Sequence, residues 1–347
     1  MRSVKLIVCV LGLAALFIQA EDPACPKKDW FGFSHGENSF FRPLLADVRA
    51  PTFNARLYKA YPDPYTLSNA KGKDWFADVS FGGDFPLFGK RCPGIMTTDL
   101  SGVQELKEVK ELKTQPGWAV LLDASVYSLL DFNTGSTNLV NTDFRFGLTW
   151  KWRPKSHHHM SYRLSVYHES THLGDEYVLD AEKLPGFSRY NVSHEAIEGM
   201  GSYDNLHHFK RVRLPSVIYR IYGGARIYIN PESFPDYVPA NPSQHGHRVD
   251  EQVGMELFWK QGRTSPEFDK PVQFIFAIDA QHRSRYTLGN PDYSWSYNVI
   301  AGAITGAYWE HGRAFKYYLS YYNGVNPHGQ FRMYHTTYLG INLGLNF

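Results

Sequence analysis

The sequence lacks several features that define large classes of proteins. Beyond residues 1–20, no segment approaches the ~20 consecutive apolar residues that a membrane-spanning helix needs. The formal net charge is only +2, so we expect no strongly charged partner and no nucleic acid. Phosphate-binding loops and dinucleotide-binding fingerprints are also missing. We therefore predict neither a helical membrane protein nor a bound cofactor or metal ion.

Cysteine is scarce as well, with three residues in the chain. Cys9 lies in MRSVKLIVCVLGLAALFIQA, where a basic start, an apolar run and a final small residue predict a secretory signal peptide over residues 1–20. An uncleaved anchor is the alternative interpretation of this stretch. Cys25 and Cys92 would then remain in an exported, oxidising setting, where we predict a disulfide between them.

Aromatic residues, in contrast, are abundant. They make up 16% of the chain, while the mean hydropathy is negative at -0.38. From about residue 117 onward, segments of about ten residues alternate between apolar and polar side chains, with turn signals between them. DFRFGLTWKW (143–152) is typical, because aromatic and leucine side chains share one face, and charged or small side chains share the other. This pattern predicts amphipathic β-strands.

The same alternation would suit a soluble β-sandwich, but three features favour a barrel in the outer membrane of a Gram-negative bacterium. The polar faces repeatedly carry charges, the apolar faces are very aromatic, and the chain ends in the amphipathic stretch YLGINLGLNF. A final strand ending in Phe347 is the kind of signal that the barrel assembly machinery recognises. We expect an exported, monomeric, all-β transmembrane barrel in contact with outer-membrane lipid.

Counting the alternating segments gives about twelve antiparallel strands, an even number as single-chain bacterial barrels require. The predicted strands are 46–60, 73–84, 117–130, 141–153, 159–171, 186–198, 214–229, 249–260, 270–280, 294–309, 312–323 and 333–347. Residues 21–45 are expected to form a periplasmic segment, and 46–347 the barrel. A non-barrel insertion is expected at about 85–116, with a short helix near 99–113. With both barrel ends periplasmic, odd-numbered strands run outward.

The stretch YHESTHLGDEY (167–177) contains His-Glu-X-X-His, the signature of zinc metalloproteases. That chemistry requires a helix, so that His168 and His172 share a face. In a strand they would lie ~13 Å apart, too far to share one zinc ion. Because the alternation of SYRLSVYHEST continues into the motif, we predict a strand, with His168 and Glu169 on opposite faces. The metalloprotease interpretation therefore fails.

The predicted strand instead creates a different candidate site. His168 and Ser170 would face the lipid near the outer end of an outward-running strand. This spacing resembles the His-X-Ser on the outer wall of barrel lipid hydrolases, namely outer-membrane phospholipase A and lipid A deacylase. Ser170 would attack an ester and His168 would accept its proton. Asn191 is the candidate third member.

The third member is the weak point of this hypothesis. Asn191 shares its predicted face with Ser193 and Glu195, which we expect to point into the lumen, whereas His194 would face lipid. A bulge could turn Asn191 outward, and Asp175 or Glu176 are further candidates. In the simpler alternative, His168, Ser170 and His172 form a polar collar at the membrane interface.

Charged residues on the opposite faces predict a polar lumen. A set of basic and acidic side chains is expected to line it: Arg145, Arg163, Glu169, Arg189, Arg220, Arg226 and Glu256. Glu195 and Asp279 are expected among their ion-pair partners. Such a network can brace the interior or line a narrow pore. The leading functional prediction is thus a structural barrel or one that passes small solutes, with lipid ester hydrolysis as the alternative.

Several stretches resemble one known family. LVNTDFRFGL (139–148), YHESTHLGDEY (167–177), RIYGGA (220–225) and YYNGVNPHGQF (321–331) are similar to the bacterial domain-of-unknown-function 1207 family, as are PLLADVRAPTF and FPLF nearer the start. The resemblance covers nearly the whole mature chain, and THLGDE is its most specific element. It implies an exported, outer-membrane protein and assigns no activity.

Overall fold

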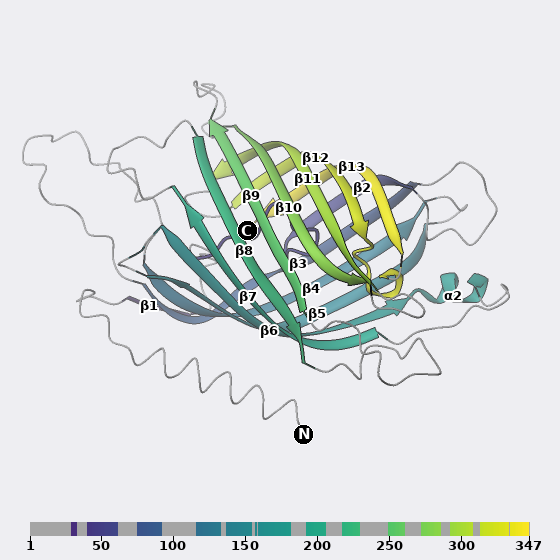
Figure 1. The fold of residues 1–347 in the computed structure, drawn as a ribbon, viewed down its shortest axis with the longest axis horizontal. Helices are drawn as coiled ribbons and strands as arrows, with labels where there is room; N and C mark the ends of the chain where they lie inside the picture. The colour runs from purple at the N-terminus through teal and green to yellow at the C-terminus, as the bar shows by residue number, and fades with distance from the viewer. Residues whose placement is uncertain are drawn as a thin grey trace, which may run out of the picture.

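Twelve antiparallel strands close into a barrel in the computed structural model (Figure 1). They are β2 (Phe53–Tyr61), β3 (Trp75–Arg91), β4 (Gly117–Asp131), β5 (Asn138–Arg153), β6 (Met160–Leu173), β7 (Val192–Asp204), β8 (Val217–Tyr228), β9 (Val249–Lys260), β10 (Gln273–Arg285), β11 (Asp292–Ala307), β12 (Arg313–Val325) and β13 (His335–Asn346). The structure describes residues 29–32, 40–61, 75–91, 116–132, 137–154, 157, 159–181, 192–205, 217–229, 249–260, 272–285, 292–307, 313–332 and 334–346.

Each strand pairs with its neighbours in the chain, and the last strand pairs with the first barrel strand. Leu345 of β13 lies opposite Phe53 of β2, and Thr337 lies opposite Tyr61. β3 extends beyond β2 and there pairs with the short strand β1 (Asp29–Gly32). Because the barrel is closed, the backbone N–H and C=O groups of its strands are hydrogen-bonded along both edges. A strand in hydrocarbon needs this pairing, since hydrocarbon offers no hydrogen-bond partners.

The predicted fold class is confirmed, with differences at a few boundaries. The strand expected over 46–60 begins only at Phe53, because residues 40–52 lie inside the barrel. Residues 85–91, expected to begin a non-barrel insertion, belong to β3, which continues to Arg91 past a register shift between Pro86 and Phe88; residues 92–115 lie outside the described residues. Where the strand was expected over 186–198, the structure describes a strand over 192–204, and residues 186–191 lie outside the described residues. The signal peptide, the helix near 99–113, Cys25, Cys92 and Phe347 lie outside the described residues.

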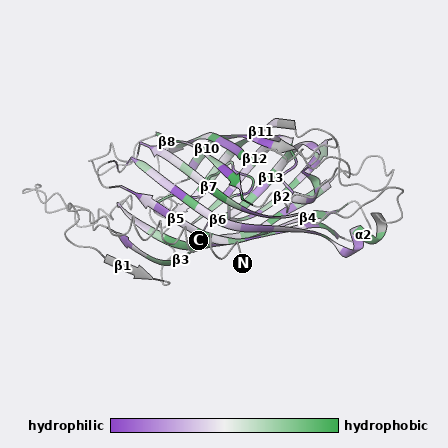
Figure 2. Cartoon of the chain, turned by 60° about the horizontal axis from the view of Figure 1, so that its bottom comes forward, coloured by the Kyte–Doolittle hydropathy of each residue, from purple (hydrophilic) through white to green (hydrophobic). Residues whose placement is uncertain are grey.

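Hydrophobic and hydrophilic residues are interspersed along the strands (Figure 2). The exposed side chains of the wall are largely apolar and the charged ones are largely buried, which is the arrangement of barrels that span membranes. On β13, for example, Ile341 is 62% exposed, whereas its neighbour Asn342 is fully buried and bonds Arg56 of β2. Leu339 and Leu343 continue the exposed apolar row. No helix in the described part of the chain is long and apolar enough to cross a membrane.

Residues 40–52, here called the plug, fill the lumen and bond to several wall strands. The backbone N–H of Leu45 donates to Glu256 at 2.7 Å, and Arg220 donates to the carbonyl oxygens of Arg42 and Pro43 at 2.9 Å. The Arg49 carbonyl accepts a hydrogen bond from Tyr127 at 2.7 Å. These contacts pair the polar groups of a chain segment that would otherwise lie unpartnered in the interior.

The connection between β12 and β13 also turns into the lumen. It contains the short 3-10 helix η3 (Gly329–Phe331) and ends with Arg332, whose guanidinium donates to Asp250 at 2.6 Å and to Tyr228 at 2.7 Å. The backbone N–H of Gly329 donates to Asp143 at 3.2 Å. This turn and the plug together occupy the interior.

Charged side chains of the inner wall form ion pairs across neighbouring strands. The pairs include Arg145–Asp123 (2.8 Å), Lys151–Asp84 (2.5 Å), Arg153–Asp204 (2.8 Å), Arg163–Glu198 (2.6 Å) and Arg220–Glu256 (2.6 Å). All of these side chains are nearly fully buried, whereas a water-filled channel past them would leave them exposed. The described lumen is therefore packed and not an open pore.

We expect the purified barrel to show no steady conductance above background in planar bilayers, because the plug and the ion pairs fill its lumen. A porin of known conductance, reconstituted in the same bilayers, serves as the control. Regular current steps that scale with the amount of protein would contradict this prediction.

We expect Arg220→Met to lower the free energy of unfolding by about 3–5 kcal/mol, since it leaves the buried Glu256 carboxylate without its cation. Ile221→Val is the matched control, because this neighbouring side chain points outward, and it should cost about 1 kcal/mol or less. Urea unfolding in detergent micelles, followed by tryptophan fluorescence, measures both. Equal free energies of unfolding for the two variants would show that the Arg220–Glu256 ion pair does not stabilise the barrel.

Candidate functional site

The candidate site lies on the outer face of β6, where the apolar row gives way to polar side chains. Leu164 and Val166 point outward, and His168, Ser170 and His172 continue the same face. His168 is exposed, with 47% of its side chain accessible. The segment is a strand, so its two histidines do not share the helical face that a zinc site requires. Within the described residues, no cluster of metal-binding side chains occurs.

The neighbouring strand β7 brings two further polar groups to this face. Ser193 lies directly opposite Ser170, and Glu195 lies opposite His168. His194 between them points into the lumen and is 4% exposed. The prediction that Ser193 and Glu195 face the lumen and His194 faces lipid is therefore wrong. Three consecutive polar residues obscure the alternation here. The signal that could have identified the outward face is the apolar Ile197, which shares the face of Ser193 and Glu195, while Glu198 shares the face of His194.

His168 lies between the side chains of Ser193 and Glu195. Its Nε2 atom is 3.4 Å from Ser193 Oγ, and its Nδ1 atom is 3.3 Å from Glu195 Oε1. A hydroxyl on one imidazole nitrogen and a carboxylate on the other is the order of groups found in serine hydrolases. The imidazole can accept the serine proton while the carboxylate orients the ring. We call Ser193, His168 and Glu195 the outer triad.

Apolar side chains surround the outer triad on the wall. Phe146 lies opposite His168 and is 61% exposed, and Phe144 lies opposite Ser170. The ring of Phe144 meets His172 edge-on at 5.8 Å. The triad thus lies where the exposed aromatic belt changes into polar surface. In membrane barrels, that transition marks the level of the lipid headgroups.

A second histidine–glutamate pair lies elsewhere on the outer face. His282 of β10 and Glu251 of β9 are directly opposite, with Nδ1 and Oε2 2.9 Å apart. The His282 ring packs on Trp295 of β11 at 5.0 Å. Like His168 and Glu195, the two residues lie directly opposite each other on neighbouring strands. The histidine of this pair contacts an aromatic ring, whereas His168 lies beside a serine hydroxyl, so the two pairs can be compared within one chain.

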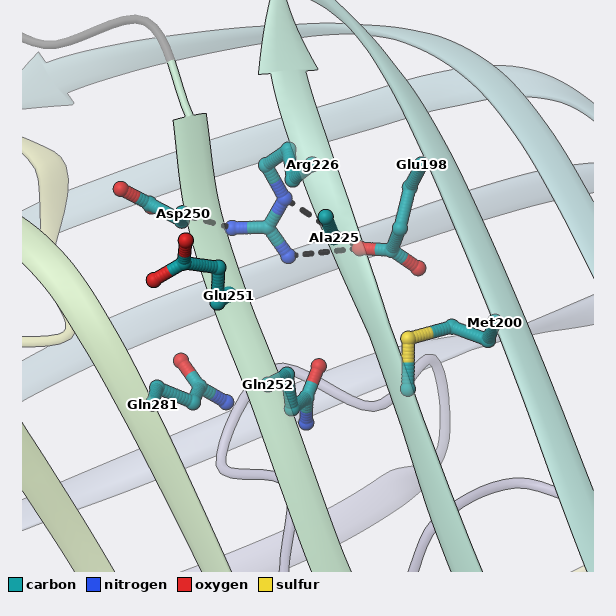
Figure 3. A pocket seen from close by; sticks show the side chains of 8 residues that line it. All are labelled: Glu198, Met200, Ala225, Arg226, Asp250, Glu251, Gln252 and Gln281. Atoms are coloured by element: carbon teal, nitrogen blue, oxygen red, sulfur yellow. Dashed lines mark hydrogen bonds and ion pairs between the residues drawn. The ribbon is translucent and has the colours of Figure 1, made fainter.

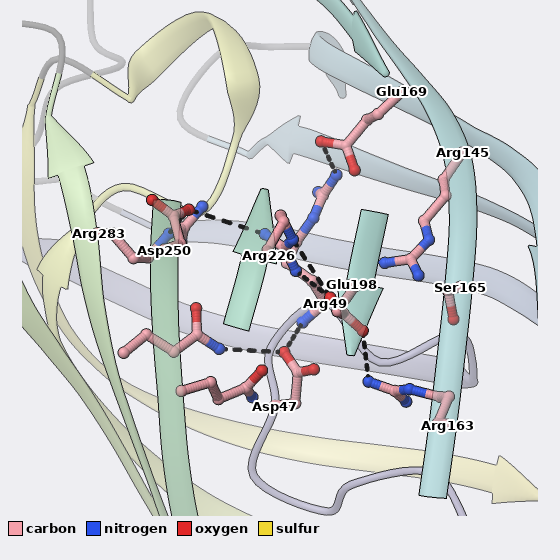
Figure 4. Close-up of polar contacts among 12 residues, drawn as sticks. Asp47, Arg49, Arg145, Arg163, Ser165, Glu169, Glu198, Arg226, Asp250 and Arg283 are labelled. Atoms are coloured by element: carbon pink, nitrogen blue, oxygen red, sulfur yellow. Dashed lines mark hydrogen bonds and ion pairs between the residues drawn. The ribbon is translucent and has the colours of Figure 1, made fainter. Parts of the chain in front are cut away.

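Six of the residues predicted to line the lumen lie on the inner face of the wall, in contrast to Ser193 and Glu195. Arg145, Arg163, Arg220 and Glu256 are buried in the pairs given above, and Arg226 donates to Glu198 at 2.7 Å (Figure 4). Glu169 forms an ion pair with Arg49 of the plug at 2.9 Å. Arg189 and Asn191 lie outside the described residues.

A small pocket lies among these lumenal groups, between β7, β8, β9 and β10 (Figure 3). Arg226 lies at its edge between Glu198 and Asp250, and Gln252 and Gln281 lie across from it. Amides, carboxylates, a guanidinium, a methionine and an alanine line it, and none of these side chains carries a hydroxyl or thiol nucleophile. The arrangement can hold ordered water between buried polar groups, and it does not provide a nucleophile–base pair.

Residues 33–347 match the family described as "protein of unknown function (DUF1207)". No curated protein matches the chain. Among solved structures, the outer membrane phospholipase A from Escherichia coli is similar at 9% identity and a TM-score of 0.47, over 90% of this chain and 95% of that one. The calcium-bound dimer of the Salmonella typhi outer membrane phospholipase is similar at 10% identity and a TM-score of 0.45, over 86% and 92%.

LpxR from Salmonella typhimurium is similar at 11% identity and a TM-score of 0.35, over 85% of this chain and all of that one. With TM-scores below 0.5, these likenesses carry no argument about this chain. The arrangement of the outer triad therefore stands on the residues of this chain.

We expect a disulfide to form across β6 and β7 in the double variant Ser170→Cys/Ser193→Cys, made with Cys25 and Cys92 replaced by serine. Directly opposed residues have Cβ atoms about 4.5–5.5 Å apart, near the reach of a disulfide. Ser170→Cys/Glu195→Cys is the control, since diagonal neighbours lie about 7–8 Å apart. Mass spectrometry after mild oxidation measures both, and efficient bonding in the control alone would refute the register.

Proposed function

Because the chain belongs to the DUF1207 family of proteins of unknown function, we propose a function from its own residues: hydrolysis of lipid esters at the outer wall of the barrel. The outer triad supports this proposal, above all the position of His168 between Ser193 Oγ and Glu195 Oε1. Ser193 replaces Ser170 as the proposed nucleophile, and Glu195 replaces Asn191 as the third member.

In the proposed reaction, Ser193 Oγ attacks the carbonyl carbon of the ester while His168 Nε2 accepts the hydroxyl proton. Glu195 orients the imidazole and stabilises the resulting imidazolium. His168 then gives its proton to the departing alkoxide, so that an alcohol leaves and an acyl-serine remains. Water attacks the acyl-serine, His168 accepts its proton, and the fatty acid departs as Ser193 regains a hydrogen.

Ser170 has a supporting role in this scheme. It lies directly across from Ser193, and opposed residues have Cβ atoms about 4.5–5.5 Å apart. Its hydroxyl is thereby within reach of a carbonyl oxygen bound at Ser193, where it can donate a hydrogen bond to the developing negative charge.

The substrate class follows from the surroundings of the triad. Phe144 and Phe146 are exposed beside it and suit acyl chains rather than water. Ester bonds of membrane lipids lie between the acyl chains and the headgroups, the level at which the apolar belt ends. We propose that the barrel resides in the outer membrane as a monomer, reaches it through the signal peptide and assembly machinery, and acts on the outer leaflet.

A non-enzymatic structural barrel is the second candidate, and the packed lumen favours it over solute passage. In that case, the His168–Glu195 pair would be an interfacial collar like the His282–Glu251 pair. The two candidates differ in one measurable property, which is ester cleavage.

We expect Ser193→Ala to lower kcat for ester cleavage by about 1,000-fold or more, and His168→Gln by about 100- to 10,000-fold. Release of p-nitrophenol from a palmitoyl ester in micelles and of fatty acid from phospholipid vesicles measures this activity. His282→Gln is the matched control and should retain wild-type rates. A fluorophosphonate should label Ser193, as seen by mass spectrometry of the peptide.

Two results would overturn this function. One is a folded wild-type barrel that cleaves neither substrate and takes no fluorophosphonate label. The other is full activity in Ser193→Ala. Loss of activity in Ser170→Ala with full activity in Ser193→Ala would instead return the nucleophile to Ser170.

A further inference from the structure

The inner side of the wall behind the outer triad contacts both the plug and the turn between β12 and β13. Glu169 lies between His168 and Ser170 on β6, and its side chain points inward. Directly opposite on β7 is His194, which lies between Ser193 and Glu195. Each triad residue is therefore a chain neighbour of Glu169 or His194.

Arg49 of the plug connects Glu169 to a second strand. Its Nη2 atom lies 2.9 Å from Glu169 Oε1, and its Nη1 donates to Asp143 of β5 at 2.8 Å (Figure 4). The guanidinium also lies over the Tyr127 ring of β4, 3.8 Å from the centroid. One side chain of the plug thus fixes the relative positions of three strands.

Arg49 is positively charged in this environment. Burial by itself lowers the pKa of Arg49, but the carboxylates of Glu169 and Asp143 outweigh that effect and hold the pKa above its usual value. Arg49 is therefore available as a cation to Glu169 and Asp143.

The turn between β12 and β13 supports the same stretch of β6. Gln330 donates to the carbonyl oxygen of Thr171 at 3.2 Å. Gly329 packs so closely on Thr171 that a Cβ atom at residue 329 would lie 2.7 Å from Thr171 Cγ2. On β7, the His194 ring packs edge-on against Tyr228 at 4.9 Å, and Arg332 donates to that tyrosine.

We infer that Arg49 is a positioning residue for the outer triad: its ion pair with Glu169 inside the barrel holds the β6 backbone that presents His168 outside. This inference rests on the proposed function and names the plug as part of its machinery. In a strand, adjacent side chains leave the same backbone in opposite directions, so fixing Glu169 restricts the motion of His168. A displacement of about 1 Å at a reacting group can cost about 100-fold in rate.

We expect Arg49→Met to lower kcat for ester cleavage by up to about 100-fold with little change in KM, because the apolar substrate surface is untouched. Arg49→Lys keeps the charge and should recover part of the loss. Arg153→Met is the matched control, since it breaks an equally buried pair, Arg153–Asp204, toward the opposite end of β5. Rates are normalised to folded protein, measured from the mobility of unheated samples on gels.

Hydrogen exchange gives a second measurement that does not depend on ester cleavage. Backbone amides at 168–170 should exchange faster in Arg49→Met than in Arg153→Met. In the double variant Arg49→Met/Glu169→Gln, the increase in exchange at 168–170 should be smaller than the sum of the increases in the two single variants. The reason is that both substitutions remove the same ion pair.

Unchanged exchange at 168–170 in Arg49→Met would overturn the inference, as would equal losses of kcat in Arg49→Met and Arg153→Met. Failure of the proposed function has a different signature, namely an inactive wild type or an active Ser193→Ala. Faster exchange in an inactive barrel would uphold the bracing by Arg49 while rejecting hydrolysis.

Discussion

Pairing of β13 with β2 is the interaction on which the rest of the structure depends. Without it, two long strands would present unpaired N–H and C=O groups, which neither hydrocarbon nor a packed interior can satisfy. Closure also fixes which side of every strand faces inward, since side chains alternate along a strand. The separation of an apolar exterior from a charged interior follows from this one pairing and the sequence pattern.

A closed barrel of this size still has to fill its centre. The chain does so with a peptide segment, an inward turn and buried aromatic and aliphatic side chains such as Phe41, Phe76 and Phe258. Arg220 and Glu256 bond to the plug and to each other, so the wall and its contents share one hydrogen-bonded network. Removing any one partner leaves a buried charge, which makes such a network resistant to gradual opening.

Sequence periodicity was sufficient for the barrel and for most inward and outward faces. In DFRFGLTWKW (143–152) every second residue is apolar, so the outward face of β5 is evident. It failed at Ser193, His194 and Glu195, where both faces are polar and the apolar Ile197 that marks the outward face lies further along the strand. It also failed for the plug, because Leu45 meets Glu256 across 211 positions of sequence, and no local pattern encodes that contact. The triad was therefore predicted only in part: His168 was identified, and Ser193 was not.

The place of the plug in the chain has a consequence for assembly. Residues 40–52 immediately precede β2, one of the two strands that form the seam. The plug can therefore lie against the concave side of the sheet before the seam between β2 and β13 closes. Asp143 and Glu169 would then pair with Arg49 before closure, and no state would be needed in which these carboxylates are enclosed without their cation. The barrel would close around its contents, so that no empty intermediate has to exist.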